Sequence, residues 1–174
     1  MRTVFAITCL LLSLTAVKSI RAEQMPQISG ETLADHSIEF PFATAGSVTI
    51  VFVGFSHASQ SQLKAWTDRA TNQFHNNPHV AIYSIAVLED APRFVRGMAV
   101  HGIKRGTPVA QQDHFVVVYH GESELKRVAG FQRSEDAYVL ILSPKGEIKW
   151  VTHGPVTDAT LRELGKQANT TSPE

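Results

Sequence analysis

Continuous apolar runs alternate along the chain with segments in which apolar residues recur at helical spacing. Residues 47–55 (SVTIVFVGF) form an unbroken β-branched and aromatic run after Gly46, a pattern typical of a strand buried on both faces. Residues 56–60 are polar and include two serines that can cap a helix. Four apolar residues then recur at spacings of three and four, which predicts an amphipathic helix ending near residue 76. They are Leu63, Trp66, Ala70 and Phe74.

The alternation continues through the middle of the chain. Residues 80–88 and 115–119 are apolar runs that predict two more buried strands. Between them we expect a short helix over residues 93–100 and a loop over residues 102–112. Residues 124–128 fit either a helix or a strand.

The last third of the chain predicts a hairpin followed by a helix. Residues 138–142 and 147–151 are apolar stretches of strand length, and the Pro- and Gly-containing residues 143–146 separate them as a turn. Thr157 or Asp158 can cap the final helix.

The element order predicts an α/β fold with one principal domain. Residues 23–45 are expected to form an N-terminal extension with an edge segment, interrupted by Pro41, which cannot donate to a strand ladder. Residues 46–168 are expected to form the domain and residues 169–174 a disordered tail. Strand, helix, strand, helix, hairpin and helix in this order predict a three-layer α/β/α sandwich with a mixed sheet.

The amino terminus has the pattern of a secretory signal. A short basic start precedes an apolar run over residues 3–17, which is shorter than the roughly 20 residues that span a bilayer. We expect cleavage after Ala22, with Ser19 as a second candidate, so that the mature chain begins at Glu23 and is periplasmic or secreted. Cys9, the only cysteine of the 174 residues, is removed with the signal.

The composition of the mature chain excludes several functions. Because the mature chain has no cysteine, it cannot form disulfides, carry out thiol–disulfide exchange, act as a thiol peroxidase or bind zinc through cysteine. Lys and Arg total 16, as do Asp and Glu, and the signal removes three basic residues. The product is therefore mildly acidic and lacks the basic excess that phosphate neutralisation needs, so we expect no nucleic-acid partner.

Three local features resemble the thioredoxin-like superfamily, in its redoxin branch, over residues 38–164. They are the strand and loop of residues 50–56, the helix that contains Trp66, and the hairpin of residues 138–148. The resemblance implies the thioredoxin-like fold for the domain.

A narrower resemblance adds an expectation about function. Residues 146–150 followed by Gly154, and residues 83–92 before the central loop, resemble the assembly factors of the mitochondrial F-type ATP synthase. This resemblance implies an assembly or chaperone-type role.

The chain departs from the superfamily where its chemistry is expected. In the family, the loop after the first buried strand carries the reactive cysteine, and a cis proline faces it just before the hairpin. The two positions of the family's active-site cysteines correspond here to Ser56 and Ser59, or to His57 and Gln60. A serine cannot replace cysteine in this chemistry, because a hydroxyl cannot exchange electrons with a thiol. Residues 134–137 contain no proline. We therefore expect a degenerate active-site loop with no catalytic residue, in which the serines act as helix caps.

The eight histidines show no HExxH motif and no helical i,i+4 pair. The sequence spacings that come closest to those of a metal site are His75 with His79, and Asp113 with His114 and His120. We expect no metal site and no cofactor. A non-thiol enzyme or a histidine-based metal carrier on the same fold is the alternative.

The favoured function is a redox-inactive binding or assembly factor with a protein partner in the cell envelope, because fold alone does not confer activity. A basic cluster before Gly106 is suited to an acidic partner or an anionic membrane surface. The candidate partner-binding residues are Trp66, Arg93, Arg96, Lys104, Arg105 and Asp136.

Overall fold

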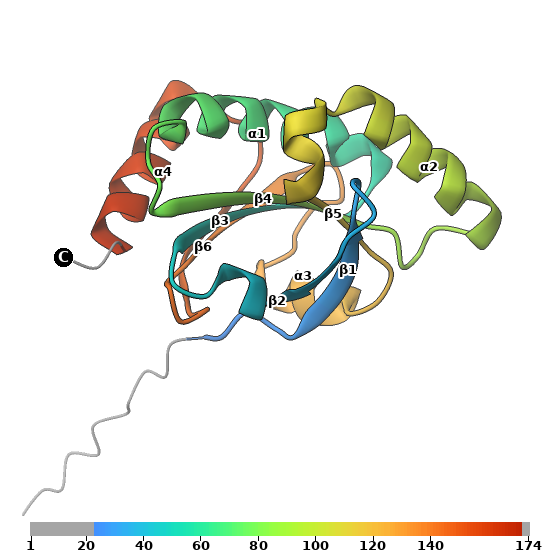
Figure 1. The fold of residues 1–174 in the computed structure, drawn as a ribbon, viewed down its shortest axis with the longest axis horizontal. Helices are drawn as coiled ribbons and strands as arrows, with labels where there is room; N and C mark the ends of the chain where they lie inside the picture. Colours follow the sequence, from blue (N-terminus) through green and yellow to red (C-terminus); the bar gives the residue numbers. More distant parts are fainter. Residues whose placement is uncertain (1–22, 172–174) are drawn as a thin grey trace, which may run out of the picture.

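The computed structural model describes residues 23–171, which form a seven-stranded sheet with helices on both faces (Figure 1). The strand order is β2-β1-β5-β4-β3-β6-β7, with β3, β4 and β5 parallel and the remaining pairs antiparallel. The predicted α/β class and mixed sheet are confirmed. The strands are β1 Ile28–Thr32, β2 Ser37–Phe40, β3 Val48–Gly54, β4 Val80–Val87, β5 Phe115–Val118, β6 Ala137–Leu142 and β7 Ile148–His153. The helices are α1 Gln60–Phe74, α2 Arg93–Gly106, α3 Glu122–Val128 and α4 Asp158–Thr171, with 3-10 turns η1 Phe42–Thr44, η2 His57–Ser59 and η3 Val109–His114.

Two hydrophobic cores lie on the two faces of the sheet, and β3 contributes to both. Val51 and Val53 pack on the side covered by α3, whereas Ile50 and Phe52 pack against α1 and α4 on the other side. All seven residues of β3 are buried. The unbroken apolar run of this strand is therefore explained, because side chains alternate between two buried faces.

Helix α2 is longer than the sequence pattern indicated. It runs from Arg93 to Gly106, so the loop expected over residues 102–112 is wrong, and η3 occupies most of the remainder. Half-buried Val95, Ala99 and Ile103 recur at a spacing of four, which keeps one side of the helix against the protein. This packing outweighs the helical cost of Gly102 and Gly106, about 1 kcal/mol each.

The ends of the domain also differ from expectation. The edge strand is confirmed, but it belongs to a β1–β2 hairpin, and Pro41 follows β2 instead of interrupting a strand. α4 extends to Thr171, so residues 169–171 are helical and not part of a disordered tail. Residues 124–128 are helical within α3.

The predicted signal segment, with Cys9, lies outside the described residues. No helix in the part of the chain that the structure describes has both the length and the apolar character needed to cross a bilayer.

Candidate functional site

The loop between β3 and α1 is closed by its own serine side chains. Ser56 Oγ accepts a hydrogen bond from the Ala58 amide (3.1 Å) and donates one to the Ser134 carbonyl (2.6 Å). Ser59 is buried, and its Oγ donates to the Ser56 carbonyl (2.9 Å). Ser56 therefore caps η2 as predicted, whereas Ser59 stands at the N-cap position of α1 without a capping hydrogen bond. Both hydroxyl protons are directed to carbonyls, not to the general base that a nucleophilic serine needs.

His57 and Gln60 complete the degenerate loop without an evident chemical partner. His57 is exposed, and neither side chain makes a hydrogen bond or ion pair within residues 23–171. The loop therefore offers two unpaired polar groups that are available to a ligand.

Residues 134–137 face this loop from the neighbouring strand. The pairing of Gly54 with Ala137 and the hydrogen bond from Ser56 join the two segments. The peptide bond Phe40–Pro41 is the one cis bond among residues 23–171, and it lies at the end of β2. The loop and the facing segment therefore lie together, as the resemblance implied, and residues 56–60 and 134–137 contain neither cysteine nor proline.

A stack of rings behind the facing segment was not predicted from the sequence. The buried Tyr138 hydroxyl donates to the Arg133 carbonyl (2.9 Å) and accepts from two successive backbone amides, and its ring stacks on Phe131 and His153. His153 Nδ1 lies 2.8 Å from Asp136 Oδ2. These contacts join the facing segment to β6 and β7. The predicted hairpin was the available sequence signal, and its register in the structure places Tyr138 opposite His153.

Helix α3 adds a cation to the outer side of this stack. Lys126 Nζ lies 4.7 Å from the Phe131 ring centroid and 2.5 Å from Oε1 of the buried Glu122. The hydrogen bond with Glu122 raises the pKa of Lys126 above its usual 10.5. The ion pair therefore stabilises the charged form of Lys126 beside the ring stack.

A cavity of about 260 Å³ opens beside the loop. Its walls come from the loop, the end of β4 and the inner side of α2, and they are mainly apolar. His57 and Asp90 are the titratable side chains that line it. The chief apolar lining residues are Phe55, Leu63, Val87, Leu88, Val95 and Ala99.

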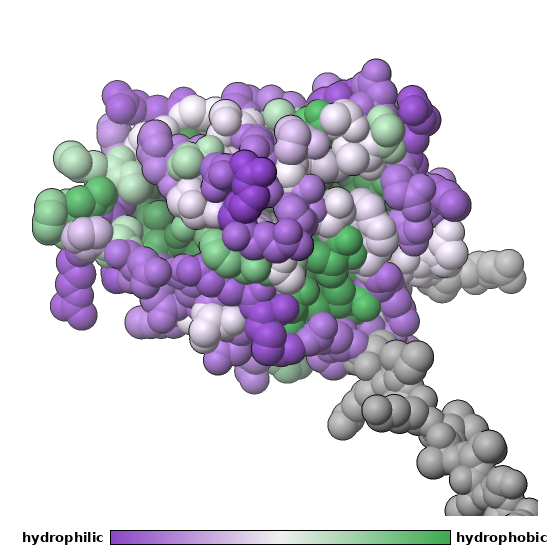
Figure 2. All heavy atoms as spheres, turned by 180° about the vertical axis from the view of Figure 1, so that it is seen from behind, coloured by the Kyte–Doolittle hydropathy of each residue, from purple (hydrophilic) through white to green (hydrophobic). Residues whose placement is uncertain are grey.

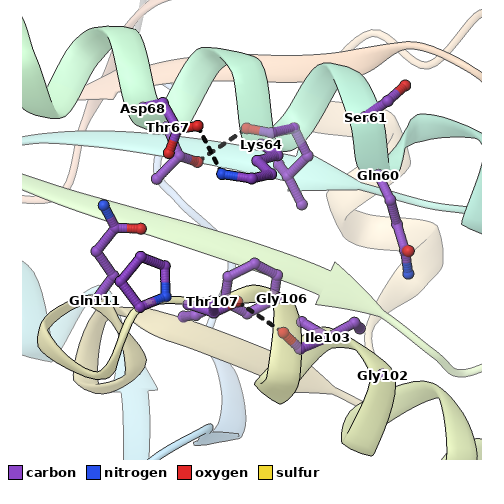
Figure 3. Close-up of a pocket in the computed structure, with 13 residues that line it drawn as sticks. Gln60, Ser61, Lys64, Thr67, Asp68, Gly102, Ile103, Gly106, Thr107 and Gln111 are labelled. Atoms are coloured by element: carbon purple, nitrogen blue, oxygen red, sulfur yellow. Dashed lines mark hydrogen bonds and ion pairs between the residues drawn. The ribbon is translucent and has the colours of Figure 1, made fainter.

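A second cavity, of about 250 Å³, continues from the first between α1 and the carboxyl end of α2 (Figure 3). Gln60 and Leu63 line both cavities. Ile103 and Phe115 add apolar wall further along. We refer to the two cavities together as the α1–α2 groove.

The charged residues that α1 contributes to the rim of the α1–α2 groove pair with each other. Lys64 Nζ and Asp68 Oδ2 form an ion pair of 2.7 Å along α1, and Figure 3 shows them across the groove from Thr107. Gly102 and Gly106 present no side chain on the α2 wall, and a Cβ added at either would meet nothing within 4 Å. The groove therefore has room for an uncharged segment of chain.

Two of the four basic residues predicted to bind a partner form hydrogen bonds or ion pairs within the protein. Arg96 donates to two backbone carbonyls of the turn before α2, and its guanidinium lies 5.3 Å from the Tyr119 ring centroid. Lys104 Nζ pairs with Asp35 Oδ2 at 3.0 Å. These contacts tie α2 to the domain.

The other two basic residues, Arg93 and Arg105, are exposed and make no hydrogen bond or ion pair within the described residues. The same helix exposes 84% of Phe94 and 71% of Met98. Sequence reasoning did not identify these two apolar residues as surface features.

Trp66 and Asp136 are in the interior, which excludes the partner-binding role predicted for them. Trp66 is fully buried, its Nε1 donates to the Gly154 carbonyl (2.8 Å), and its ring stacks on Phe52. Asp136 is buried beside His153. Neither side chain reaches the surface.

The histidine spacings do not assemble a metal site in residues 23–171, where no three metal-ligating side chains come together. His75 Nδ1 lies 2.8 Å from the Asn72 carbonyl, and His114 packs against the Tyr83 ring. Asp113 instead pairs with His36 (2.8 Å).

Known structures share this fold at low sequence identity. A candidate thiol:disulfide interchange protein DsbE from Chlorobium tepidum has a TM-score of 0.58 and 10% identity, covering 86% of this chain and 96% of its own. BsSco, of the Sco family of cytochrome c oxidase assembly proteins, has a TM-score of 0.57 and 12% identity (85% and 95% covered). StoA from Bacillus subtilis has a TM-score of 0.55 and 17% identity (82% and 96% covered). The domain therefore has the thioredoxin-like fold of the redoxin proteins.

The sequence also matches a known family along almost its whole length. No curated protein sequence matches this chain. A family model described as "ATP10 protein" matches residues 14–170, in agreement with the narrower resemblance to ATP synthase assembly factors. The protein is accordingly a member of the ATP10 protein family.

Proposed function

We propose that this protein is an exported, redox-inactive assembly factor that holds a segment of a protein partner in the α1–α2 groove. The observation that carries the proposal is an open apolar groove beside a loop that has the redoxin position but no thiol. In this reading the site binds and orients a chain, and no bond is made or broken.

The groove chemistry supports a segment of polypeptide as the occupant. Its walls are mainly apolar, Lys64 and Asp68 on its rim pair with each other, and Gln60 and His57 offer unpaired polar groups at the loop end. Binding pockets combine apolar walls with a few polar groups that fix orientation in the same way.

The family supports an assembly role. Membership of the ATP10 family and the fold shared with BsSco, which belongs to a family of cytochrome c oxidase assembly proteins, are both consistent with an assembly factor. A non-thiol enzyme or metal carrier has no comparable support in the described residues, where the serine hydroxyls bond carbonyls and histidines do not cluster.

Site-specific photo-crosslinking in intact cells tests the groove. A photoreactive amino acid replaces His57 at the loop or Ser61 on the groove wall, and Phe42 serves as a control because it is exposed outside the groove. We expect the same envelope protein to be captured from the first two positions and not from the third. Equal capture at Phe42, or different proteins from the two groove positions, would contradict the proposal.

Two further measurements test the redox inactivity and the export of the protein. The purified protein is expected to reduce insulin at the background rate, and activity above a heat-inactivated sample would show that the site is redox-active. The native product is expected to begin at Glu23 in intact-mass analysis. A product that retains Met1 and Cys9 would overturn export by this signal.

A further inference from the structure

We propose that the outer face of α2, formed by Arg93, Phe94, Met98, His101 and Arg105, docks on an anionic lipid surface. This surface is separate from the α1–α2 groove, and the proposal does not depend on the partner-binding function.

The spacing of four of these residues places them together, and Arg93 lies next to Phe94 at the start of the helix. Phe94, Met98, His101 and Arg105 follow one another by four, three and four positions, which aligns them along one side of a helix. All four are exposed. α2 lies at one end of the molecule in Figure 1, and in the reverse view of Figure 2 hydrophobic residues gather at the corresponding protruding end.

The exposure of this face is not required by the fold. No residue of α2 is fully buried, and the side that contacts the domain is formed by Val95, Ala99 and Ile103. Phe94 and Met98 point away from that side and line neither cavity of the groove. Two large apolar side chains at adjacent turns, with 84% and 71% exposure, give α2 an apolar surface that suits an interface.

The charges of α2 complement an anionic surface. The helix contains no Asp or Glu, and Arg93 stands in its first turn, where the helix dipole disfavours a cation. Two neighbouring carboxylates have other partners: Asp35 pairs with Lys104, and Glu89 accepts a hydrogen bond from the first amide of α3. Asp90 lines the cavity at the loop. Arg93 and Arg105 make no hydrogen bond or ion pair within the described residues, so both can meet phosphate groups.

The geometry favours a lipid surface over a protein pocket. Arg93 and Arg105 are separated by twelve residues, or about 18 Å of helix, with Phe94 and Met98 between them. Cations that flank an apolar pair along a surface helix match an interface in which the apolar side chains enter below the headgroups.

Vesicle sedimentation of the protein with its native amino terminus tests the proposal. Vesicles of equal parts phosphatidylcholine and phosphatidylglycerol are compared with phosphatidylcholine alone, at two salt concentrations. We expect binding to the anionic vesicles that weakens as salt rises, and little binding to the neutral ones. All variants carry the same terminus, so residues 1–22, where retained, contribute equally.

Paired variants identify the surface. Phe94→Ser is expected to weaken binding about tenfold, whereas Phe42→Ser, which removes the same side chain from another exposed site, is expected to have no effect. Arg93→Ser with Arg105→Ser is expected to weaken binding roughly 25-fold, about fivefold for each charge. Thermal unfolding by circular dichroism should be unchanged for all these exposed positions.

Three results would overturn the proposal. They are absence of binding to anionic vesicles, equal binding to neutral vesicles, and equal effects of Phe94→Ser and Phe42→Ser. Loss of a co-purified acidic protein from the α2 variants, without any vesicle binding by the parent protein, would assign this face to a protein partner instead. None of these results bears on the groove crosslinks from His57, so the two proposals fail separately.

Discussion

Replacing Ser56 by alanine distinguishes a structural hydroxyl from a nucleophilic one. The change removes the acceptor for the Ala58 amide and the donor to the Ser134 carbonyl. A lost N-cap costs about 1 kcal/mol, and a lost hydrogen bond near the surface costs about 0.5–1 kcal/mol. We therefore expect the free energy of unfolding to fall by roughly 1.5–2 kcal/mol.

Urea unfolding followed by circular dichroism measures this loss. With a denaturant slope of about 2 kcal/mol/M for a domain of this size, the midpoint should fall by roughly 0.8–1 M. Ser61→Ala is the matched control, since Ser61 is exposed and its side chain has no hydrogen-bond partner within residues 23–171. Its effect should stay within about 0.5 kcal/mol.

A chemical labelling experiment tests the same point about Ser56. A fluorophosphonate reagent, which labels activated serines, should not modify Ser56, because its proton is donated to a carbonyl and no base is adjacent. The reasoning is refuted if Ser56→Ala is no more destabilising than Ser61→Ala, or if the reagent labels Ser56 in the folded protein.

Three more predictions follow from the described contacts. Trp66→Phe should lower the free energy of unfolding by about 2–4 kcal/mol, because it leaves a cavity and a buried carbonyl without its donor; a loss below about 1 kcal/mol in urea unfolding would contradict this. Ser56→Cys with Ser59→Cys should form an internal disulfide and reduce insulin above background, since the spacing and the helix start suit a reactive thiol; two free thiols after mild oxidation would argue against it. Glu122→Gln should lower the pKa of Lys126 towards 10.5 in an NMR titration, and an unchanged pKa would refute the assigned cause. Because the pKa of Lys126 is raised in the folded protein, the stabilisation that it provides is present below 10.5 and is lost as pH rises through the raised value, so the parent should lose more stability there than Glu122→Gln.

The strands were the most predictable elements, for a physical reason. Residues 47–55 and 80–88 are rich in apolar residues, and β3 is buried along its whole length while β4 is buried over its second half, so the pattern and the tertiary environment largely agree. α2 was less predictable because Gly102, Gly106 and Pro108 look like loop residues in isolation. The packing of one side of the helix against the domain is not visible in these local signals.

The candidate site was predictable only in part. The position of the loop between β3 and α1 followed from the residues after a recognisable strand, and Ser56 caps as expected. The burial of Asp136 was not predictable, because its partner His153 lies 17 residues away on the next strand. Exposure of Phe94 and Met98 likewise depends on where α2 sits relative to the sheet, which helical periodicity alone does not specify.

The alternation of β3 between two cores has a consequence for how the protein opens. A fluctuation that exposes Val51 also displaces Phe52, because adjacent residues of one strand serve opposite layers. Neither of the two hydrophobic cores can therefore unfold at β3 while the other stays intact. Amides of β3 should therefore exchange with solvent only through global unfolding, whereas those of α2, which buries no residue completely, should exchange through local opening. The helix proposed to meet the membrane can then adjust its position without disturbing the centre of the domain.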